Sequence, residues 1–329
     1  MLTSVNIEFH YYTIHFLAVQ SGFPQDDASL IAYSSQFVDS NIIQYAIETP
    51  RGLYETQVTQ NYGFWNSEAL KTINVPFHFI PGEGLKKEYA QRRDGKRHPL
   101  LTRPNSPYAK RLFIDALSTK NLYRIGIAVH SFADTWAHQN FSGLRSNLNA
   151  FDGTVVIPPI GHAQALNNPD LSDTVWQDPR LKESSVINID RFLAAAQKIY
   201  RYFCVHNGNS FEDEELVMAE LKTKYAGSRR RNLDERLLDF IIEDGIEKYS
   251  RTLWLEESIG ALEDPGDESL FKGYNKVLWL KDEVLYGNSL IKRKPKKAAA
   301  GFFDSHLYKW MEAAKAHRGN ALSLFGHLL

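Results

Sequence analysis

The stretch that decides the fold is Ile127-Ala-Val-His130-Ser-Phe-Ala-Asp134-Thr-Trp-Ala-His138, an otherwise apolar run in which three side chains that can ligate a metal recur at intervals of four residues. At about 100° per residue, positions i, i+4 and i+8 stay on one face of an α-helix. His130, Asp134 and His138 can therefore point into one cavity. A half-buried polar stripe satisfied by its neighbours is the alternative. Two imidazoles and a carboxylate on the stripe that should face the core favour a metal site.

The composition is that of a globular protein. The chain has 329 residues, 43% of them hydrophobic, which is enough to bury a sizeable core. The formal net charge of −1 gives no overall electrostatic reason to expect a nucleic acid or an anionic surface as partner. Cys204 is the single cysteine, which excludes an internal disulfide framework and a cysteine-rich zinc finger.

The ends and apolar runs of the sequence bear on its location. The first ten residues lack a basic segment followed by a sustained apolar one, so we expect no signal peptide. No apolar run approaches the roughly 20 residues that span a bilayer, so we expect no transmembrane segment. The sequence indicates a protein made in the cytoplasm, and leaves open export by a route that needs no cleavable signal.

Helical periodicity dominates the chain wherever a period can be assigned. Apolar positions and helix-start signals predict helices over 10–21, 25–40, 105–141, 188–206, 211–224, 231–257, 268–286 and 303–318. Residues 50–105 and 142–179 are rich in Pro, Gly and polar residues and predict irregular structure, with the segment around His78 as a loop held against the core. We expect a mainly α, multi-helical single domain over 1–329, in which 1–180 carries the metal site and 181–329 supports it.

Residues that can ligate a metal gather before residue 180. With His98 set aside because it lies in a basic loop, the candidates are His10, His15, Asp39, His78, His130, Asp134, His138, His162 and Asp170. Nitrogen and carboxylate donors without thiolate suit Zn²⁺, and Fe²⁺ or Mn²⁺ less well. A site that keeps an open coordination position is usually catalytic.

Five short motifs occur in a fixed order along residues 9–170. They are Phe9-His10-Tyr-Tyr, Ser35-Gln-Phe-Val-Asp39, Phe77-His78-Phe-Ile-Pro, His130-Ser-Phe-Ala-Asp134-Thr-Trp-Ala-His138-Gln-Asn-Phe-Ser-Gly143 and Gly161-His162-Ala-Gln-Ala. This order resembles the zinc-dependent phospholipase C and single-strand nuclease superfamily, all-helical enzymes with a trinuclear zinc cluster. It resembles more closely an uncharacterised bacterial family of about this length with the same motif string. The resemblance implies a phospholipase C/nuclease-like fold and two or three zinc ions.

The resemblance also implies a ligand set. Asp39, His78, His130 and Asp134 would form the first zinc site, and His138, His162 and a later acid the second. In the phospholipases that acid lies four residues after its histidine, but Leu166 stands there in this chain. Asp170 or Asp173 must substitute, and we prefer Asp170.

The third site departs from the superfamily, which uses the amine and carbonyl of a processed N-terminal tryptophan. Here nine residues precede His10 and no processing signal is evident. Either His10 completes a different third site with Asp134 as the bridging ligand, or the centre is dinuclear. His15 is the less favoured alternative to His10, because five residues on a helix turn it well away.

The implied chemistry is phosphodiester hydrolysis. Clustered Zn²⁺ ions lower the pKa of a bound water to about 7 and stabilise phosphoryl oxygens during in-line displacement. Asp39 would ligate zinc and accept the proton of the attacking water, so it is the expected catalytic residue. We expect a phospholipase C-like hydrolase acting on a phosphodiester substrate, with a phospholipid ahead of a nucleic acid.

Three alternative hypotheses for the function are compatible with the same residues. The first is a non-catalytic, zinc-stabilised helical interaction protein whose coordination positions are all filled by protein. The second is a single-strand nuclease-like phosphodiesterase, which the near-neutral charge disfavours. A phosphohydrolase of the His-Asp doublet type ranks last, because the chain has no adjacent His-Asp pair. The oligomeric state stays open.

Overall fold

The structure is a computed structural model that describes residues 6–60, 66–82, 91–95, 97–151, 157–226, 232–260 and 295–329. Helices dominate these residues, and the sheets are small, so the fold is mainly α as the periodicity predicts. The principal hydrophobic cluster runs along the chain from Phe9 to Phe325. Among the described residues no helix combines the length and apolarity that crossing a membrane requires. The helix expected over 268–286 lies outside the described residues.

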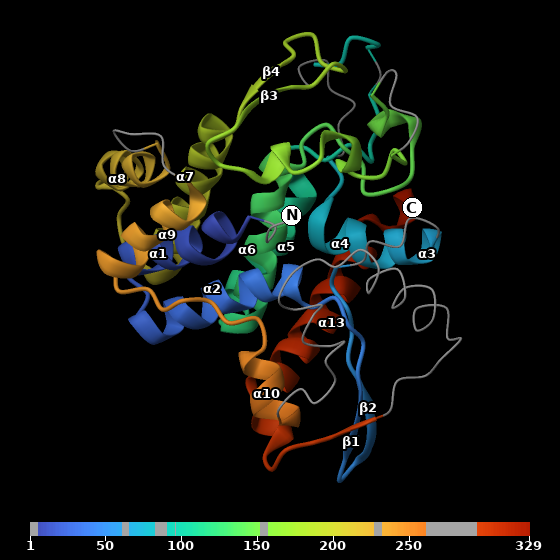
Figure 1. Ribbon diagram of the computed structural model, residues 1–329, viewed down its shortest axis with the longest axis vertical. Coiled ribbons are helices and arrows are strands. Elements are labelled where there is room, and N and C mark those ends of the chain that lie inside the picture. Colours follow the sequence, from blue (N-terminus) through green and yellow to red (C-terminus); the bar gives the residue numbers. More distant parts are fainter. Residues whose placement is uncertain are drawn as a thin grey trace.

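Helix α6, Leu122–Ala137, runs through the middle of the molecule (Figure 1). Nearly every side chain from Arg124 to Ala137 is buried, because other helices surround it. Helix α5, Pro107–Ser118, packs beside it. The continuous helical region expected over 105–141 is therefore two helices, separated where Lys120 takes a left-handed conformation at φ 54°.

Helix α2, Gln25–Ser40, has the bounds that the sequence predicts and packs closely on α6. Gly126 on α6 permits the close approach: a Cβ there would lie 2.4 Å from Cβ of Ser34 and 2.5 Å from the carbonyl oxygen of Ile31. The missing side chain lets the two backbones approach. As a result Asp39, near the end of α2, lies beside the polar stripe of α6.

The N-terminal helical region begins with a π-helix, Glu8–Thr13, and continues as α1, Ile14–Gln20. The predicted helix over 10–21 is confirmed, but its first part is wound more loosely than an α-helix. All six residues of the π-helix are buried. π-Turns are rare and occur often at functional sites.

The segment around His78 is helical, so the prediction of a loop there was wrong. Helix α3, Ser67–Ala69, passes into a π-helix, Leu70–Asn74, and then into α4, Val75–His78. Pro76 suggested a break, but it lies in the first turn of α4, where a backbone N–H is not needed. His78 is consequently held at the end of a helix that packs against α6.

The C-terminal half supplies further helices that flank this centre. They are α7, Asn188–Asn207; α8, Glu214–Ala226; α9, Leu233–Ile242; α10, Leu253–Ile259; and α13, His306–Phe325. The predictions over 188–206 and 211–224 are confirmed, and the last helix runs past the predicted 303–318. The single helix expected over 231–257 was wrong: the chain leaves α9 and passes Gly245 at φ 67°, a conformation that favours glycine.

Short strands and turns complete the architecture. Strands β1, Ala46–Thr49, and β2, Gly52–Glu55, form an antiparallel hairpin, and β5, Lys296–Lys297, runs parallel to β1. Strands β3, Val175–Gln177, and β4, Ser185–Ile187, form a second hairpin. The two hairpins lie at opposite ends of the molecule (Figure 1). Short 3-10 turns occupy Asn147–Asn149, Ala163–Ala165, Asn168–Asp170, Phe302–Asp304 and Gly326–Leu328.

Candidate metal centre

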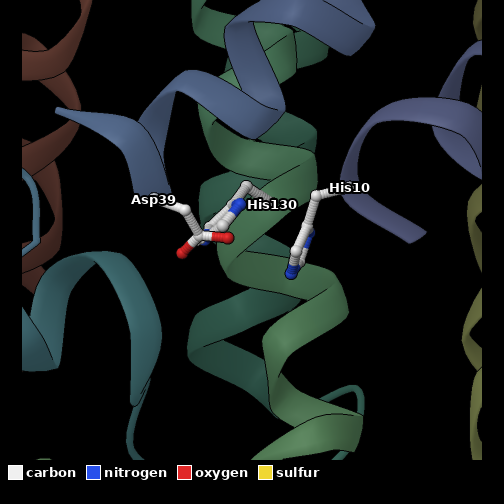
Figure 2. A group of neighbouring side chains, drawn as sticks. All are labelled: His10, Asp39 and His130. Carbon is white, nitrogen blue, oxygen red and sulfur yellow. Dashed lines mark ion pairs between the residues drawn. The ribbon is translucent and has the colours of Figure 1, made fainter. Parts of the chain in front are cut away.

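Three side chains from different helices meet at the middle of α6. His10 comes from the N-terminal π-helix, Asp39 from the end of α2 and His130 from α6, and all three point toward one another (Figure 2). Their ligand atoms lie within 4.8 Å of one another, and all three residues are buried. The imidazoles of His10 and His130 are stacked, with ring centroids 3.9 Å apart. Two rings and a carboxylate thus face one small volume.

Asp134 lies one turn after His130 on α6 and presents its two oxygens to different neighbours. Its Oδ1 lies 3.0 Å from Nε2 of His10. Its Oδ2 lies 3.0 Å from Nδ1 of His78 and 3.3 Å from Nε2 of His130. This is the arrangement of a carboxylate able to bridge two cations. We call His10, Asp39, His78, His130 and Asp134 the inner cluster.

A second group lies at the end of α6. His138 follows the last helical residue, and its Nε2 lies 3.3 Å from Oδ1 of Asp170. His162, from the loop region, places its Nε2 3.5 Å from Oδ2 of the same carboxylate. His162 is 20% exposed, whereas Asp170 and His138 are buried. We call His138, His162 and Asp170 the outer cluster, because it reaches the surface.

Backbone carbonyls orient three of the histidine rings. Nε2 of His78 donates to the carbonyl oxygen of Thr59 at 2.9 Å, and Nδ1 of His138 donates to that of His78 at 2.8 Å. Nδ1 of His162 donates to the carbonyl oxygen of Leu166 at 2.9 Å. When a neutral imidazole donates from one nitrogen, the other nitrogen carries a lone pair. In all three rings that second nitrogen faces the carboxylates, which is how metal-ligating histidines are held.

The residues fit a bound cation. Inside the inner cluster, Nδ1 of His78 lies 3.2 Å from Nε2 of His130 and 3.0 Å from a carboxylate oxygen of Asp134. Lone pairs at such distances repel unless a proton or a cation lies between them. Both oxygens of Asp39 are buried without a hydrogen-bond partner. Buried polar atoms are normally paired, so these atoms are suited to coordinate a metal.

The spacing agrees with tetrahedral coordination. Zinc binds imidazole nitrogen and carboxylate oxygen at about 2.0–2.2 Å, which puts neighbouring ligand atoms of a tetrahedron about 3.3–3.6 Å apart. The distances from Oδ1 of Asp39 to Nε2 of His130 and Nδ1 of His78 are 3.7 and 3.8 Å. Small shifts of side chains would therefore complete the coordination. Both clusters could hold metal ions.

Burial and neighbouring charges shift the pKa values of the two inner carboxyls in opposite directions. Burial raises the pKa of Asp39 well above its usual range, and the nearby carboxylate of Asp134 raises it further. Burial also opposes ionisation of Asp134, but the surrounding imidazoles outweigh it and hold its pKa well below the usual range. Asp134 is thus the ionised partner of the histidines. A cation beside Asp39 would favour its ionised form as well.

In the outer cluster, too, burial and neighbouring charges have opposite effects on the pKa values. Burial alone would lower the pKa of His138, but the carboxylates of Asp134 and Asp170 outweigh it and raise the pKa to about 9. Burial lowers the pKa of His162 despite the nearby Asp170. Without a metal, His138 carries the proton that neutralises the carboxylates. A metal ion would take over that neutralising charge and release the proton.

The structure brings together all eight residues proposed from the sequence: His10, Asp39, His78, His130, Asp134, His138, His162 and Asp170. His15 and Asp173, the alternative ligands that the sequence left open, have other partners. Nε2 of His15 bonds to Oγ of Ser29 at 3.0 Å, and Asp173 pairs with Arg236.

A comparison with protein families places the chain. A family model described as a family of unknown function, DUF6765, matches residues 5–325, almost the whole sequence. The chain belongs to this family. No curated protein and no solved structure matches the chain. Membership of DUF6765 carries no activity with it, so the function has to be argued from the site.

Sequence reasoning missed one residue that shapes the centre of this DUF6765 protein. Arg191, on α7, is buried and donates to the carbonyl oxygens of Trp136 and Ala137, the last residues of α6. These carbonyls have no partner within the helix. The sequence does contain a sign of this role: Arg191 is a charged residue on the otherwise apolar face of α7, directly before Phe192. Arg191 therefore fixes the helix end from which His138 leaves.

Proposed function

We propose that this protein is a metal-dependent phosphodiester hydrolase, phospholipase C-like, with a di- or trinuclear zinc centre. The observation that carries the proposal is the carboxylate of Asp134, whose Oδ1 faces His10 while its Oδ2 faces His78 and His130. Ligands on both sides of one carboxylate imply more than one cation. Centres of two or more metals with oxygen and nitrogen ligands commonly serve phosphodiester hydrolysis. The resemblance of the motif order to that of the phospholipase C and nuclease superfamily supports the same proposal.

The ions would supply a water of lowered pKa and positive charge opposite the phosphoryl oxygens. The side chains have separate tasks. Among the inner histidines, His78 holds its ring through the carbonyl oxygen of Thr59, so its coordination costs little reorganisation. Asp39 has two carboxylate oxygens without a hydrogen-bond partner, and one of them can ligate while the other accepts a proton from the attacking water.

The substrate would approach from the side of the outer cluster. Seven of the eight ligand candidates are at most 6% exposed, and only His162 reaches 20%. Among the described ligand candidates, His162 offers the most exposed position at which a phosphodiester could meet Asp170 and His138. We therefore assign substrate binding to the outer cluster and the positioning of water to Asp39 in the inner cluster.

The strong burial of the inner cluster also favours a second candidate, a zinc-stabilised helical protein without catalysis. Coordination positions filled by protein atoms leave no place for a substrate. Metal content alone cannot separate the two functions, because both hold zinc. Hydrolysis of phosphodiesters by the loaded protein separates them.

The test combines elemental analysis with hydrolysis assays on protein purified without an affinity tag or chelator. We expect two or three zinc ions per chain and cleavage of bis-p-nitrophenyl phosphate. Phosphatidylcholine in mixed micelles and single-stranded oligonucleotides distinguish a phospholipase from a nuclease. Asp134→Asn should lose most of the metal and all the activity. His306→Ala is the matched control, since His306 contacts Tyr123 and Trp254 away from the centre.

The outcomes separate the proposals. Two or three zinc ions with no cleavage of any phosphodiester would favour the structural role of the metal. A protein that stays metal-free when zinc is supplied would refute the proposed function. Equal metal content in Asp134→Asn and in the His306→Ala control would refute the assignment of the centre.

A further inference from the structure

A buried arginine of the C-terminal half pairs with the segment that carries His10. Arg236 lies on α9, is 3% exposed, and places its Nε 2.7 Å from Oε1 of Glu8 and its Nη2 3.1 Å from Oε2. Glu8 is itself buried and begins the π-helix that contains His10. A bidentate pair of this kind fixes direction as well as distance. The guanidinium thus holds the turn from which His10 projects into the inner cluster.

The same guanidinium also reaches the segment that carries Asp170. Nη1 of Arg236 lies 2.8 Å from Oδ2 of Asp173. Oγ of Ser172 donates to the carboxylate of Glu8, which closes the network. Ser172 and Asp173 lie two and three residues after Asp170, which ends a 3-10 turn and is a member of the outer cluster. One side chain therefore links the chain segments of both clusters.

Energetics indicate what such a pair does. Removing two charges from water is costly, and replacing a buried ion pair by apolar residues is often neutral or stabilising. A buried pair is consequently weak support for stability and is better attested as a device that fixes register. Here the two partners of Arg236 stand two or three residues from a ligand candidate: Glu8 before His10, and Asp173 after Asp170.

We propose that Arg236 is a positioning residue that holds the His10 and Asp170 segments together, so that metal binding at both clusters depends on one guanidinium of α9. The inference rests on the proposed metal centre and deepens it. It gives the C-terminal half a role in the site beyond completing the core. A positioning role of this kind is expected to change metal affinity by about tenfold or more.

The test compares zinc affinities, by competition with a chromophoric chelator, in four variants. Arg236→Met should weaken the binding of all ions, because both segments lose their partner. Asp173→Asn should weaken only the outer cluster by about tenfold, and the fold should survive since Asp173 is 42% exposed. Arg236→Lys keeps the charge but cannot form the fork, so it should fall between wild type and Arg236→Met. Arg201→Met, which breaks a pair with Glu214 elsewhere, is the control.

Hydrogen exchange gives a readout that needs no metal. In chelator-treated protein, Arg236→Met should raise amide exchange in both 6–13 and 166–174, while α5 keeps the wild-type rate. Cobalt-substituted wild type and Asp173→Asn should differ in their visible absorption, because the outer ligands shift. If Arg236→Met does not fold, the Asp173→Asn comparison still decides.

Wild-type protein without any metal would refute the proposed function, and unchanged exchange would then refute the role of Arg236 as well. A different result would refute the positioning role alone. Wild type would bind metal normally, and Arg236→Met would match Arg201→Met in zinc affinity and in amide exchange. Loss confined to one cluster in Arg236→Met would also contradict it.

Discussion

The imidazole of His138 is oriented by the main chain of His78: its Nδ1 donates to the carbonyl oxygen of His78 over 2.8 Å. The side chain of His78 meanwhile faces Asp134 in the inner cluster. A single residue at the end of α4 thus contributes its ring to one cluster and its backbone to the other. The two contributions can be separated by mutation, because side-chain truncation leaves the carbonyl in place.

We expect His78→Ala to remove metal from the inner cluster and to leave the outer cluster able to bind. The matched variant His162→Ala should do the reverse, since its ring belongs to the outer cluster alone. In elemental analysis His162→Ala should lose about one ion per chain, and His78→Ala about one in a dinuclear centre or two in a trinuclear one. Loss of all metal from His78→Ala would show that the inner and outer clusters bind as one unit.

Gly126→Ala should separate Asp39 from His130. The added Cβ would meet Cβ of Ser34 at 2.4 Å, so α2 and α6 must move apart. Overpacking of this kind costs about 1–3 kcal/mol, and we expect weaker metal binding with it. Gly319→Ala on α13 is the control, because no atom lies within 4 Å of its added Cβ. Urea unfolding should show Gly319→Ala unchanged or stabilised by up to about 1 kcal/mol. Equal stability of the two variants would contradict the close packing of the helices.

Arg191→Met should loosen the end of α6. It would leave the carbonyls of Trp136 and Ala137 buried and without the partner they now have, at a cost of about 1–3 kcal/mol. His138 follows these residues, so the outer cluster should lose affinity while the inner cluster keeps it. Thermal unfolding together with zinc titration checks both effects. An unchanged melting temperature would contradict the role of Arg191 at the helix end.

His317 should make the protein sensitive to acid. Burial lowers its pKa to about 4, and its Nε2 lies 3.1 Å from the carbonyl oxygen of Pro76. The unfolded chain binds this proton near pH 6.5 and the folded protein does not, so stability falls as the pH drops from about 6.5 toward 4. In metal-free protein, His317→Asn should reduce the loss of unfolding free energy between pH 7 and pH 5 by about 1–2 kcal/mol.

His15 makes a second contribution of the same sign, because burial lowers its pKa to about 4 as well. The double variant with His15→Gln should therefore be less sensitive to acid than either single variant.

His138 acts in the opposite direction in metal-free protein: its raised pKa of about 9 gives stability below pH 6.5 that is lost as the pH rises toward 9. If the unfolding free energies of wild type and His317→Asn had the same pH dependence, His317 could not be neutral in the folded protein as proposed.

Local patterns in the sequence were sufficient to predict the centre of the fold. The spacing of His130, Asp134 and His138 requires only the period of an α-helix, and Asp26 and Asp27 mark the start of α2 in the same local way. His78 was misplaced because a proline permits either a loop or the first turn of a helix. Packing against α6 decides whether a loop or a helix forms there. That contact joins segments far apart in the sequence, so no local pattern predicts it.

The remaining details depend on contacts between distant segments. Asp170 and Asp173 both follow Pro169 on the chain, and their difference arises because Arg236 draws Asp173 away while Asp170 faces His138. No spacing rule connects α9 to that loop. The orientation of His78 by the carbonyl oxygen of Thr59 has no sequence signal at all, since every residue carries a carbonyl.

The π-helix of Glu8–Thr13 makes the direction of His10 depend on the number of residues in one turn. An α-helix needs one residue fewer for the same hydrogen-bonded loop. Deleting a single residue between His10 and Ile14 would let this turn close as an ordinary α-helix and rotate the His10 side chain by about 100° relative to α1. The core would still find apolar residues to bury, but the imidazole would leave Asp134. An insertion or deletion of one amino acid could thus remove or create this ligand without any change in the residue that supplies it.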